Sequence, residues 1–447
     1  MAVLLLAVSW ACGPNGGKGD SIDGGRAEPR IDSGPTPCRG AECQNFCPDG
    51  KKTTLSGTVT APNGIDPVAG AIVLVPSEID EIPSTVSCDL CAHISGRAKV
   101  QATTRPDGSF SLSPIPTQAD QLPGKSIQLV VQKGRFRRVS TVTIDNPCGE
   151  NVVEEGLVSL PKKSEGQNHV PKIAIATGRY DAMECVLLRM GLDQDAFTIF
   201  EGDDYSNAPH FLDALLRDPS QMAEYDVLFL NCGNDYEGLL ADQAIRNNLA
   251  SYVEKGGRLY VTDQAYDFVE QVEVFSRFID FGPTKTTATT PELKDAAQVG
   301  AGGLVVQASI LDSELASWLS AIEKRTGKEV IGNDNRVKVE HFVEGWAVPY
   351  AVPPGPDSHA WVEGEVSGEA MPTSVRPLTM TFDYKQCGRV LFSSYHTTGK
   401  GTTTGIPPVG GKNSGYLTHC AIDQTLTPQE RILEYLILHV ADCLTIE

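Results

Sequence analysis

Acidic and amide side chains that could do chemistry follow three successive strand-like apolar runs in the middle of this chain. They fall in the loops 201–204, 231–237 and 263–267, and a histidine follows a later run of the same kind. Carboxylate and amide oxygens together with one imidazole suit a divalent cation. The residues of this predicted crevice are Asp203, Asp204, Asn231, Asp235, Glu237, Asp263, Asp267 and His396.

Two interpretations of this set stay open. In the first, Asp263, Asp267 and His396 bind a divalent cation, which would be the cofactor of the protein. In the second, the acidic residues are ordinary turn and cap residues, because Asp and Asn favour such positions and the chain is acidic throughout.

A second possible chemistry is nucleophilic. Cys232 follows the run Tyr225–Leu230 directly and faces the same predicted crevice. A nucleophilic thiol needs a lowered pKa and a base within hydrogen-bond reach, which His396 could supply if the two strands were neighbours. The alternatives are a buried inert thiol and a disulfide with Cys185.

The apolar runs belong to an alternation of strands and helices. Tyr225–Leu230 and Arg258–Thr262 are strand-like, and Asp242–Lys255 between them is amphipathic with the period of a helix. Gly256 and Gly257 end that helix. Such a βαβ unit predicts a parallel sheet, whose ligands bind at the carboxyl ends of the strands.

The same alternation extends on both sides of this unit. It begins at Lys172–Thr177 and continues with a helix over Ala182–Met190 and a strand over Phe197–Phe200. A last helix has a clear start, with Thr427 as cap, Pro428 first and Glu430 as the capping-box partner. The pattern predicts a doubly wound, flavodoxin-like α/β domain over residues 171–447.

The earlier part of the chain has a different pattern. Short alternating strands separated by turn residues predict an all-β domain over residues 53–161, joined to the α/β domain by a polar linker over residues 162–170. Residues 13–52 are rich in Gly, Pro, Ser and Asp and predict a flexible stalk. The predicted strands of the β domain are Leu55–Thr60, Ala71–Val75, Ser109–Leu112, Ile127–Val131 and Val139–Ile144.

The charge of the chain argues against nucleic acid as a partner. The 447 residues have a formal net charge of −20, whereas binding to phosphates needs clustered Lys and Arg. The one basic stretch, Arg135–Arg138, is expected to be a solvated strand end.

The first twelve residues predict where the protein resides. Met1–Ala11 is apolar and is followed by Cys12 and Gly13. This resembles the end of a bacterial lipoprotein signal, which implies an acylated Cys12 and a protein anchored in the cell envelope, on the outer membrane facing the periplasm or the cell surface. A plain secretory signal is the alternative.

The twelve cysteines of such an exported chain favour disulfides over a zinc site. We expect most of them to be oxidised, and Cys420 and Cys443, which bracket the last helix, to form one pair. The disulfide candidates are Cys38, Cys43, Cys47, Cys88, Cys91, Cys148, Cys420 and Cys443.

Three stretches of the β domain carry a family resemblance. Ser56-Gly-Thr-Val-Thr60, Pro67–Val73 and Thr104–Leu112 resemble the carboxypeptidase regulatory-like domain, a transthyretin-like sandwich that usually serves as a spacer or adhesion module. The pattern is interrupted between Val75 and Val100 by an insertion that carries Cys88 and Cys91, which we expect to be a stapled loop.

The α/β domain resembles class I glutamine amidotransferase-like proteins. The resemblance rests on Tyr225–Leu230, on Gly256–Val261 and on Cys387–His396. It implies a nucleophilic cysteine on a sharp elbow after Arg258–Thr262 and a histidine base at the position of His396. The elbow here reads Thr262-Asp-Gln-Ala-Tyr-Asp267, so the nucleophile is missing.

The predicted function follows from that absence. The order of the two domains and the joining sequence Leu160–Ile175 resemble a group of myxobacterial-type lipoproteins, which implies location and architecture without an activity. We predict an anchored lipoprotein whose α/β domain binds an envelope protein or a small molecule. The alternatives are a cysteine- or metal-dependent hydrolase and a purely structural envelope protein.

Overall fold

Partly exposed strands build the first third of this protein, whereas the part after residue 172 combines buried parallel strands with partly exposed antiparallel ones. The computed structural model describes residues 47–88, 97–116, 125–202, 211–233, 236–282, 297–343, 345–368, 371–397, 417 and 420–441. Within the chain from Ala41 to Glu447 these residues belong to one compact unit. Several predicted residues lie outside the described ranges: Cys12, Cys38, Cys43, Cys91, Asp203, Asp204, Asp235 and Cys443.

The early strands form two small sheets that share one hydrophobic core. One sheet has the order β4-β1-β7 and the other the order β3-β2-β5-β6. Leu55 and Phe110 of the first sheet and Val73 and Leu129 of the second belong to the same core cluster. The strands are β1 (Thr54–Thr58), β2 (Ile72–Glu78), β3 (Arg97–Thr103), β4 (Ser109–Leu112), β5 (Lys125–Lys133), β6 (Phe136–Ile144) and β7 (Glu150–Val152), and the short helices η2 (Pro48–Gly50) and α2 (Glu155–Val158) flank them.

The later strands form one nine-stranded sheet with the order β14-β13-β16-β17-β18-β11-β10-β8-β9. The five strands from β18 to β9 are parallel, and the other four join them through antiparallel pairs. The parallel strands are β8 (Ile173–Ala176), β9 (Phe197–Phe200), β10 (Val227–Leu230), β11 (Arg258–Thr262) and β18 (Gly388–Ser393). The antiparallel strands are β13 (Val306–Ile310), β14 (Arg336–Val339), β16 (Ser358–Gly368) and β17 (Met371–Tyr384).

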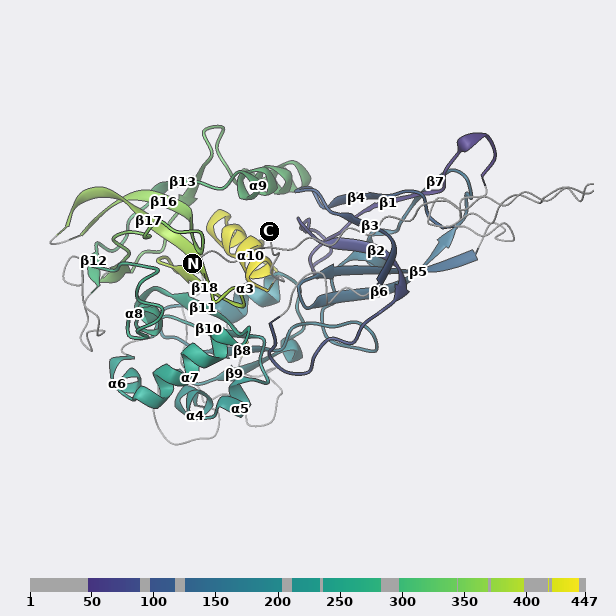
Figure 1. Cartoon of the computed structure of the whole chain (residues 1–447). Coiled ribbons are helices and arrows are strands. Elements are labelled where there is room, and N and C mark those ends of the chain that lie inside the picture. The colour runs from purple at the N-terminus through teal and green to yellow at the C-terminus, as the bar shows by residue number, and fades with distance from the viewer. Residues whose placement is uncertain are drawn as a thin grey trace, which may run out of the picture. The chain divides into compact units, whose positions relative to one another are not determined.

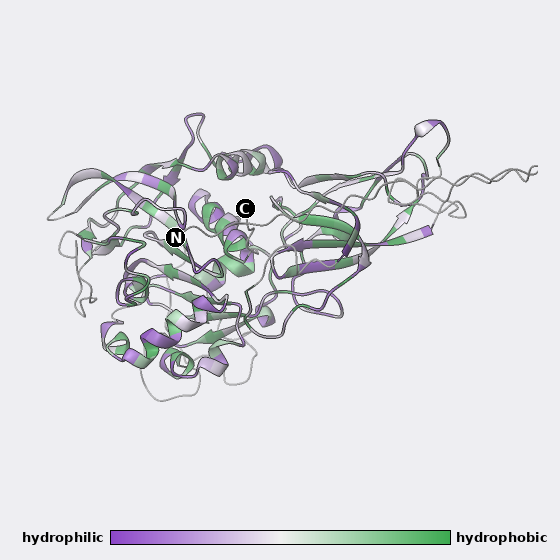
Figure 2. Cartoon of the chain, viewed as in Figure 1, coloured by the Kyte–Doolittle hydropathy of each residue, from purple (hydrophilic) through white to green (hydrophobic). Residues whose placement is uncertain are grey.

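Helices cover both faces of the parallel half (Figure 1). Side chains of one strand alternate between two cores: Ile173 and Ile175 join the core that contains α3 and α10, whereas Ala174 and Ala176 join the core that contains α4, α7 and α8. In Figure 2 helix α7 carries hydrophilic and hydrophobic residues together, as expected for a helix with one face on a sheet. The helices are α3 (Met183–Arg189), α4 (Leu212–Arg217), α5 (Pro219–Met222), α6 (Glu237–Leu240), α7 (Gln243–Glu254), α8 (Asp267–Glu270), α9 (Ser313–Thr326) and α10 (Pro428–Val440).

The predicted elements of this half are found within a few residues of their expected bounds. The predicted strands Phe197–Phe200 and Arg258–Thr262 match β9 and β11, and the capping box between Thr427 and Glu430 at the start of α10 is confirmed. Strands β3, β7, β13, β14 and β16 were not predicted, nor was β12 (Gln298–Gly300), which pairs with β15 (Trp346–Val348). No helix in the described part of the chain is both long and apolar enough to cross a membrane.

The expectation of oxidised cysteines is confirmed for the described residues, where six of seven cysteines form three disulfides. The predicted pair of Cys420 with Cys443 is wrong, because Cys420 is bonded to Cys185 of α3. The physical reason is the length of α10. Its 13 residues span about 20 Å, whereas a disulfide needs Cα atoms closer than about 7 Å.

The other two disulfides connect distant parts of the chain. Cys47 is bonded to Cys148, which attaches the end of the predicted stalk to the β-rich part. Cys88 is bonded to Cys387, in the turn between β17 and β18. The insertion that carries Cys88 is therefore joined by this bond to the nine-stranded sheet.

The basic stretch at Arg135–Arg138 was expected to be solvated, and this expectation is wrong. Arg135 and Arg137 are buried. The guanidinium of Arg135 donates to Asp226 Oδ1 at 2.6 Å and also to the carbonyl oxygens of Pro83 and Thr85. A buried charge needs such partners, and here they connect β6 to the residue that precedes β10.

Candidate functional site

Asp263 stands where the buried strand β11 turns into the short helix η4 (Asp263–Tyr266). Its φ angle is 42°, so a residue with a Cβ atom adopts the left-handed conformation. This costs roughly 1–3 kcal/mol in general and is least unfavourable for Asn and Asp. The tight turn is the elbow predicted from the sequence, and it presents a carboxylate at the position where a nucleophile was expected.

The order of the strands brings two further residues to this elbow. Strand β11 lies between β10 and β18, so the residues that follow the three strands meet at one edge of the sheet. Cys232 follows β10 and His396 follows β18. One donor atom each of Cys232, Asp263 and His396 lies within 4.8 Å of the other two, and all three residues are buried.

Both carboxylate oxygens of Asp263 have near neighbours. Oδ1 accepts a hydrogen bond of 2.7 Å from the backbone N–H of Ala347 in β15. Oδ2 lies 2.9 Å from His396 Nε2 and 3.5 Å from Cys232 Sγ. Asp263 is therefore the central member of the cluster and touches both of the others.

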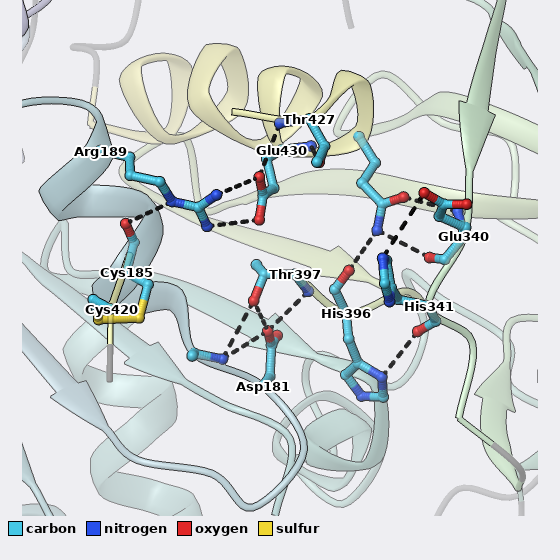
Figure 3. A network of polar contacts seen from close by, with 12 residues as sticks. Asp181, Cys185, Arg189, Glu340, His341, His396, Thr397, Cys420, Thr427 and Glu430 are labelled. Carbon is cyan, nitrogen blue, oxygen red and sulfur yellow. Dashed lines mark hydrogen bonds and ion pairs between the residues drawn. A yellow bond between two sulfur atoms is a disulfide. The ribbon is translucent and has the colours of Figure 1, made fainter. Parts of the chain in front are cut away.

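The ring of His396 is oriented from its other side (Figure 3). Nδ1 lies 3.2 Å from the backbone oxygen of His341, and since a carbonyl oxygen only accepts, Nδ1 carries the hydrogen. The side chain of Gln429 in α10 donates to the backbone oxygen of His396 at 2.6 Å and to that of Glu340 at 2.9 Å. Helix α10 thus supports the segment that carries the imidazole.

A second buried carboxylate, not singled out from the sequence, lies after β8. Asp181 Oδ1 accepts from the N–H groups of Ala182 and Thr397 and from the Thr397 hydroxyl, and Oδ2 has no hydrogen-bond partner in the structure (Figure 3). Its place between β8 and α3 is a signal that could have been found, because Asp181 follows a parallel strand as Asp263 does.

The site is tightly filled around Cys232. A Cβ atom added to Gly178, in the loop after β8, would lie 2.2 Å from the backbone oxygen of Cys232. The N–H of Tyr180 donates to that same oxygen at 3.2 Å. The backbone N–H of Cys232 in turn donates to the hydroxyl of Thr262 at 2.8 Å. The loop after β8 therefore packs directly on the thiol-bearing residue.

The electrostatics of the cluster oppose thiol chemistry. Burial raises the pKa of the Cys232 thiol well above its ordinary value, and the negative charge of Asp263 raises it further. Burial by itself disfavours the protonated form of His396, but the carboxylates of Asp263 and Asp181 outweigh burial and raise the pKa of the imidazole. A reactive cysteine needs the opposite change, a thiol with a lowered pKa.

Three further residues of the predicted crevice, Asn231, Glu237 and Asp267, are described and do not belong to the group of three donors. Asn231 is buried, and its side chain donates to Glu184 Oε2 at 3.0 Å. Asp267 is buried at the start of α8, and Glu237 begins α6 with partial exposure. Of the predicted metal ligands, the structure brings Asp263 and His396 together with Cys232, and Asp267 is not in that group. The suggested disulfide between Cys232 and Cys185 is wrong, because Cys185 is bonded to Cys420 and Cys232 is free.

Comparison with known proteins adds little to this geometry. No family model matches the chain, and no curated protein matches it either. Among solved structures, the chain is similar to a ThuA-like protein from Bacteroides uniformis, with 13% sequence identity and a TM-score of 0.32 over 61% of this chain and 94% of that protein. ThuA-like proteins have a glutamine-amidotransferase-like fold. A TM-score this low does not establish a shared fold.

Proposed function

We propose that this chain is an exported protein of the cell envelope whose α/β part binds a ligand and does not hydrolyse one. The observation that carries the proposal is the residue at the elbow. Asp263 fills the place of the expected nucleophile, and its carboxylate lies 2.9 Å from the only histidine of the described cluster, so the imidazole is paired with an anion. Among the described residues, the polar contacts of this imidazole are with Asp263 and with the backbone oxygen of His341, and neither group is a nucleophile that it could activate.

The same geometry also argues against a hydrolase that uses Cys232 as its nucleophile. Cys232 lies beside a carboxylate, and the raised pKa of its thiol leaves little thiolate at neutral pH. The loop after β8 also packs on its backbone. A purely structural role for the α/β part accounts less well for three potential donor side chains gathered at the carboxyl ends of adjacent parallel strands, where sheets of this kind bind ligands.

The rest of the chain fits a protein outside the cytoplasm. Three disulfides join parts of the chain that are 101 to 299 residues apart, and such bonds persist in oxidising compartments. We include in the proposal a lipid anchor on Cys12 at the outer membrane and a spacer role for the β-rich part as a transthyretin-like module. If the Cys12→Ala variant of the full-length precursor stayed in the detergent phase, the anchor would have to be abandoned.

The absence of hydrolysis is tested on the full chain with its disulfides intact. Glutaminase and esterase rates are expected to equal those of buffer alone, because no ionised nucleophile lies beside the imidazole. The measurement compares the wild type with Cys232→Ala and His396→Ala, and with His359→Gln, which changes a half-exposed histidine outside the cluster. A rate above background that both cluster variants abolish and His359→Gln retains would overturn the proposal.

A further inference from the structure

Three different donor types converge at the elbow. A thiol sulfur, a carboxylate oxygen and an imidazole nitrogen come from residues that follow β10, β11 and β18, and they lie within 4.8 Å of one another. Their separations are 3.5 Å from Cys232 Sγ to Asp263 Oδ2 and 2.9 Å from Asp263 Oδ2 to His396 Nε2. Ligand atoms about 2.0–2.3 Å from a single zinc ion lie at about this spacing from one another.

The imidazole of His396 is prepared as a ligand. Its Nδ1–H is directed at the backbone oxygen of His341, so Nε2 is the ring atom that faces the cluster. A metal-bound histidine nearly always donates its other ring N–H to a carbonyl or a carboxylate in this way. Nε2 is buried 2.9 Å from Asp263 Oδ2, and the protonated imidazole forms an ion pair with that carboxylate. A divalent cation between the same two atoms would take the place of the Nε2 proton.

The carboxylate of Asp263 is also held in an orientation that suits a metal ligand. Asp263 Oδ1 is held by the N–H of Ala347, which leaves Oδ2 to face the other two donors. Outer-shell hydrogen bonds of this kind fix the orientation of metal ligands before the metal binds.

The donor set selects among metals. Calcium and magnesium prefer oxygen ligands only, and the sulfur of Cys232 does not suit them. A mixture of thiolate, imidazole and carboxylate suits zinc, which accepts all three. The nearby carboxylate of Asp181, whose Oδ2 is buried without a hydrogen-bond partner, adds negative charge on the same side of the sheet.

We propose that Cys232, Asp263 and His396 bind one zinc ion at the carboxyl ends of β10, β11 and β18. Binding releases two protons to solvent, one from the Cys232 thiol and one from Nε2 of the His396 imidazolium, and the thiolate and the Asp263 carboxylate then balance the charge of the ion. Three protein ligands leave one tetrahedral position open, and that position takes an oxygen or nitrogen donor of a ligand. The inference rests on the proposed binding role of this site and names the chemical class that it recognises.

Metal content is the first test. The full chain, purified with its disulfides intact and dialysed against zinc, is expected to contain one zinc per chain by mass spectrometry of the elements. Competition with a chromophoric chelator gives the affinity. Cys232→Ser and His396→Gln keep the size of each side chain and are each expected to weaken binding by more than the roughly 10–100-fold that loss of an outer-shell partner causes. The matched control is His359→Gln, which should bind like the wild type.

Cobalt gives a second readout, in which visible bands that remain in a variant show that its site still folds. Cobalt-loaded wild type is expected to show the near-ultraviolet charge-transfer band of a thiolate ligand, and Cys232→Ser should keep the weaker visible bands of cobalt while losing that one. Zinc well below one per chain in the wild type, or a thiolate band that survives in Cys232→Ser, would overturn the site.

Different results would overturn the metal proposal and the proposed function. Hydrolysis by the zinc-loaded wild type that is lost in His396→Gln would overturn the non-hydrolytic role and leave the metal site standing. If the chain neither bound zinc nor hydrolysed any substrate, the metal site would be overturned and the proposed binding role would stand.

Discussion

Replacing Arg431 by methionine is expected to lower the free energy of unfolding by about 3–5 kcal/mol. Arg431 of α10 is nearly buried and pairs with two buried carboxylates, Glu434 one turn along the helix at 2.8 Å and Asp66 of the β-rich part. Without the guanidinium, both carboxylates stay buried without their counter-charge. Urea unfolding of wild type and variant at pH 7 measures the difference.

A matched control distinguishes the effect of losing a buried ion pair from the effect of losing an exposed one. Arg325 of α9 pairs with Glu155 at 3.1 Å, and both side chains are partly exposed. Its replacement by methionine is expected to cost less than about 1 kcal/mol. A loss for Arg431→Met that is no larger than this would contradict the prediction.

The triple variant Arg431→Met, Asp66→Asn, Glu434→Gln tests the cause. It removes all three charges at nearly constant volume, so most of the lost stability should return. If the triple variant were as unstable as the single one, packing of the arginine stem, and not the uncompensated charge, would explain the loss.

The pH dependence supplies an independent check with a definite sign. Burial, and next the charge of Asp66, raise the pKa of Glu434 well above the ordinary value of 4.5, whereas Arg431 lowers it. Between the unfolded and folded pKa values the folded state therefore binds more protons, so stability falls as the pH rises above about 4.5, by up to about 1.4 kcal/mol per pH unit. Arg431→Met raises the folded pKa further, and the fall should extend to higher pH in that variant.

Removal of the disulfide between Cys185 and Cys420, by changing both residues to alanine, is expected to cost about 2–5 kcal/mol. The bond closes a stretch of 235 residues and attaches the segment before α10 to α3. Equilibrium unfolding measures the loss, and faster hydrogen exchange should appear in α10, because its start is then held less firmly.

A second connection between α3 and α10 sharpens this experiment. Arg189 of α3 makes two hydrogen bonds to Glu430 of α10, at 2.7 and 2.9 Å (Figure 3). Because the disulfide and this pair hold the same two elements, Arg189→Met combined with loss of the disulfide should deviate from additivity by about 0.5–3 kcal/mol. An unchanged unfolding midpoint in the double alanine variant, with the bond shown intact in the wild type by peptide mapping, would contradict the prediction.

Local patterns were enough to predict the parallel half of the large sheet. Strands β8, β9, β10, β11 and β18 are continuous apolar runs because both of their faces are buried. Helix α10 was predicted from its capping residues, which act within one turn of the chain. Such features depend on near neighbours in the sequence, so the sequence determines them.

The antiparallel half was harder to predict for the same physical reason. Strands β16 and β17 pair with irregular register, and β3 of the β-rich part, which was also not predicted, has no fully buried residue. Their side chains meet partners that come from distant segments, and no local pattern records such partners. The burial of Arg135 could not be predicted for the same reason, because only the folded chain brings Asp226 to it.

The residue types of the candidate site could be predicted, but their grouping could not. Asp263 and His396 were singled out because they follow strands, and Cys232 for the same reason. That Cys232 and His396 both reach Asp263 depends on the place of β11 between β10 and β18, which is a property of the sheet order. The sequence determined which side chains lie at strand ends, whereas only the tertiary structure decided which three meet, because strand order is set by packing across the whole sheet.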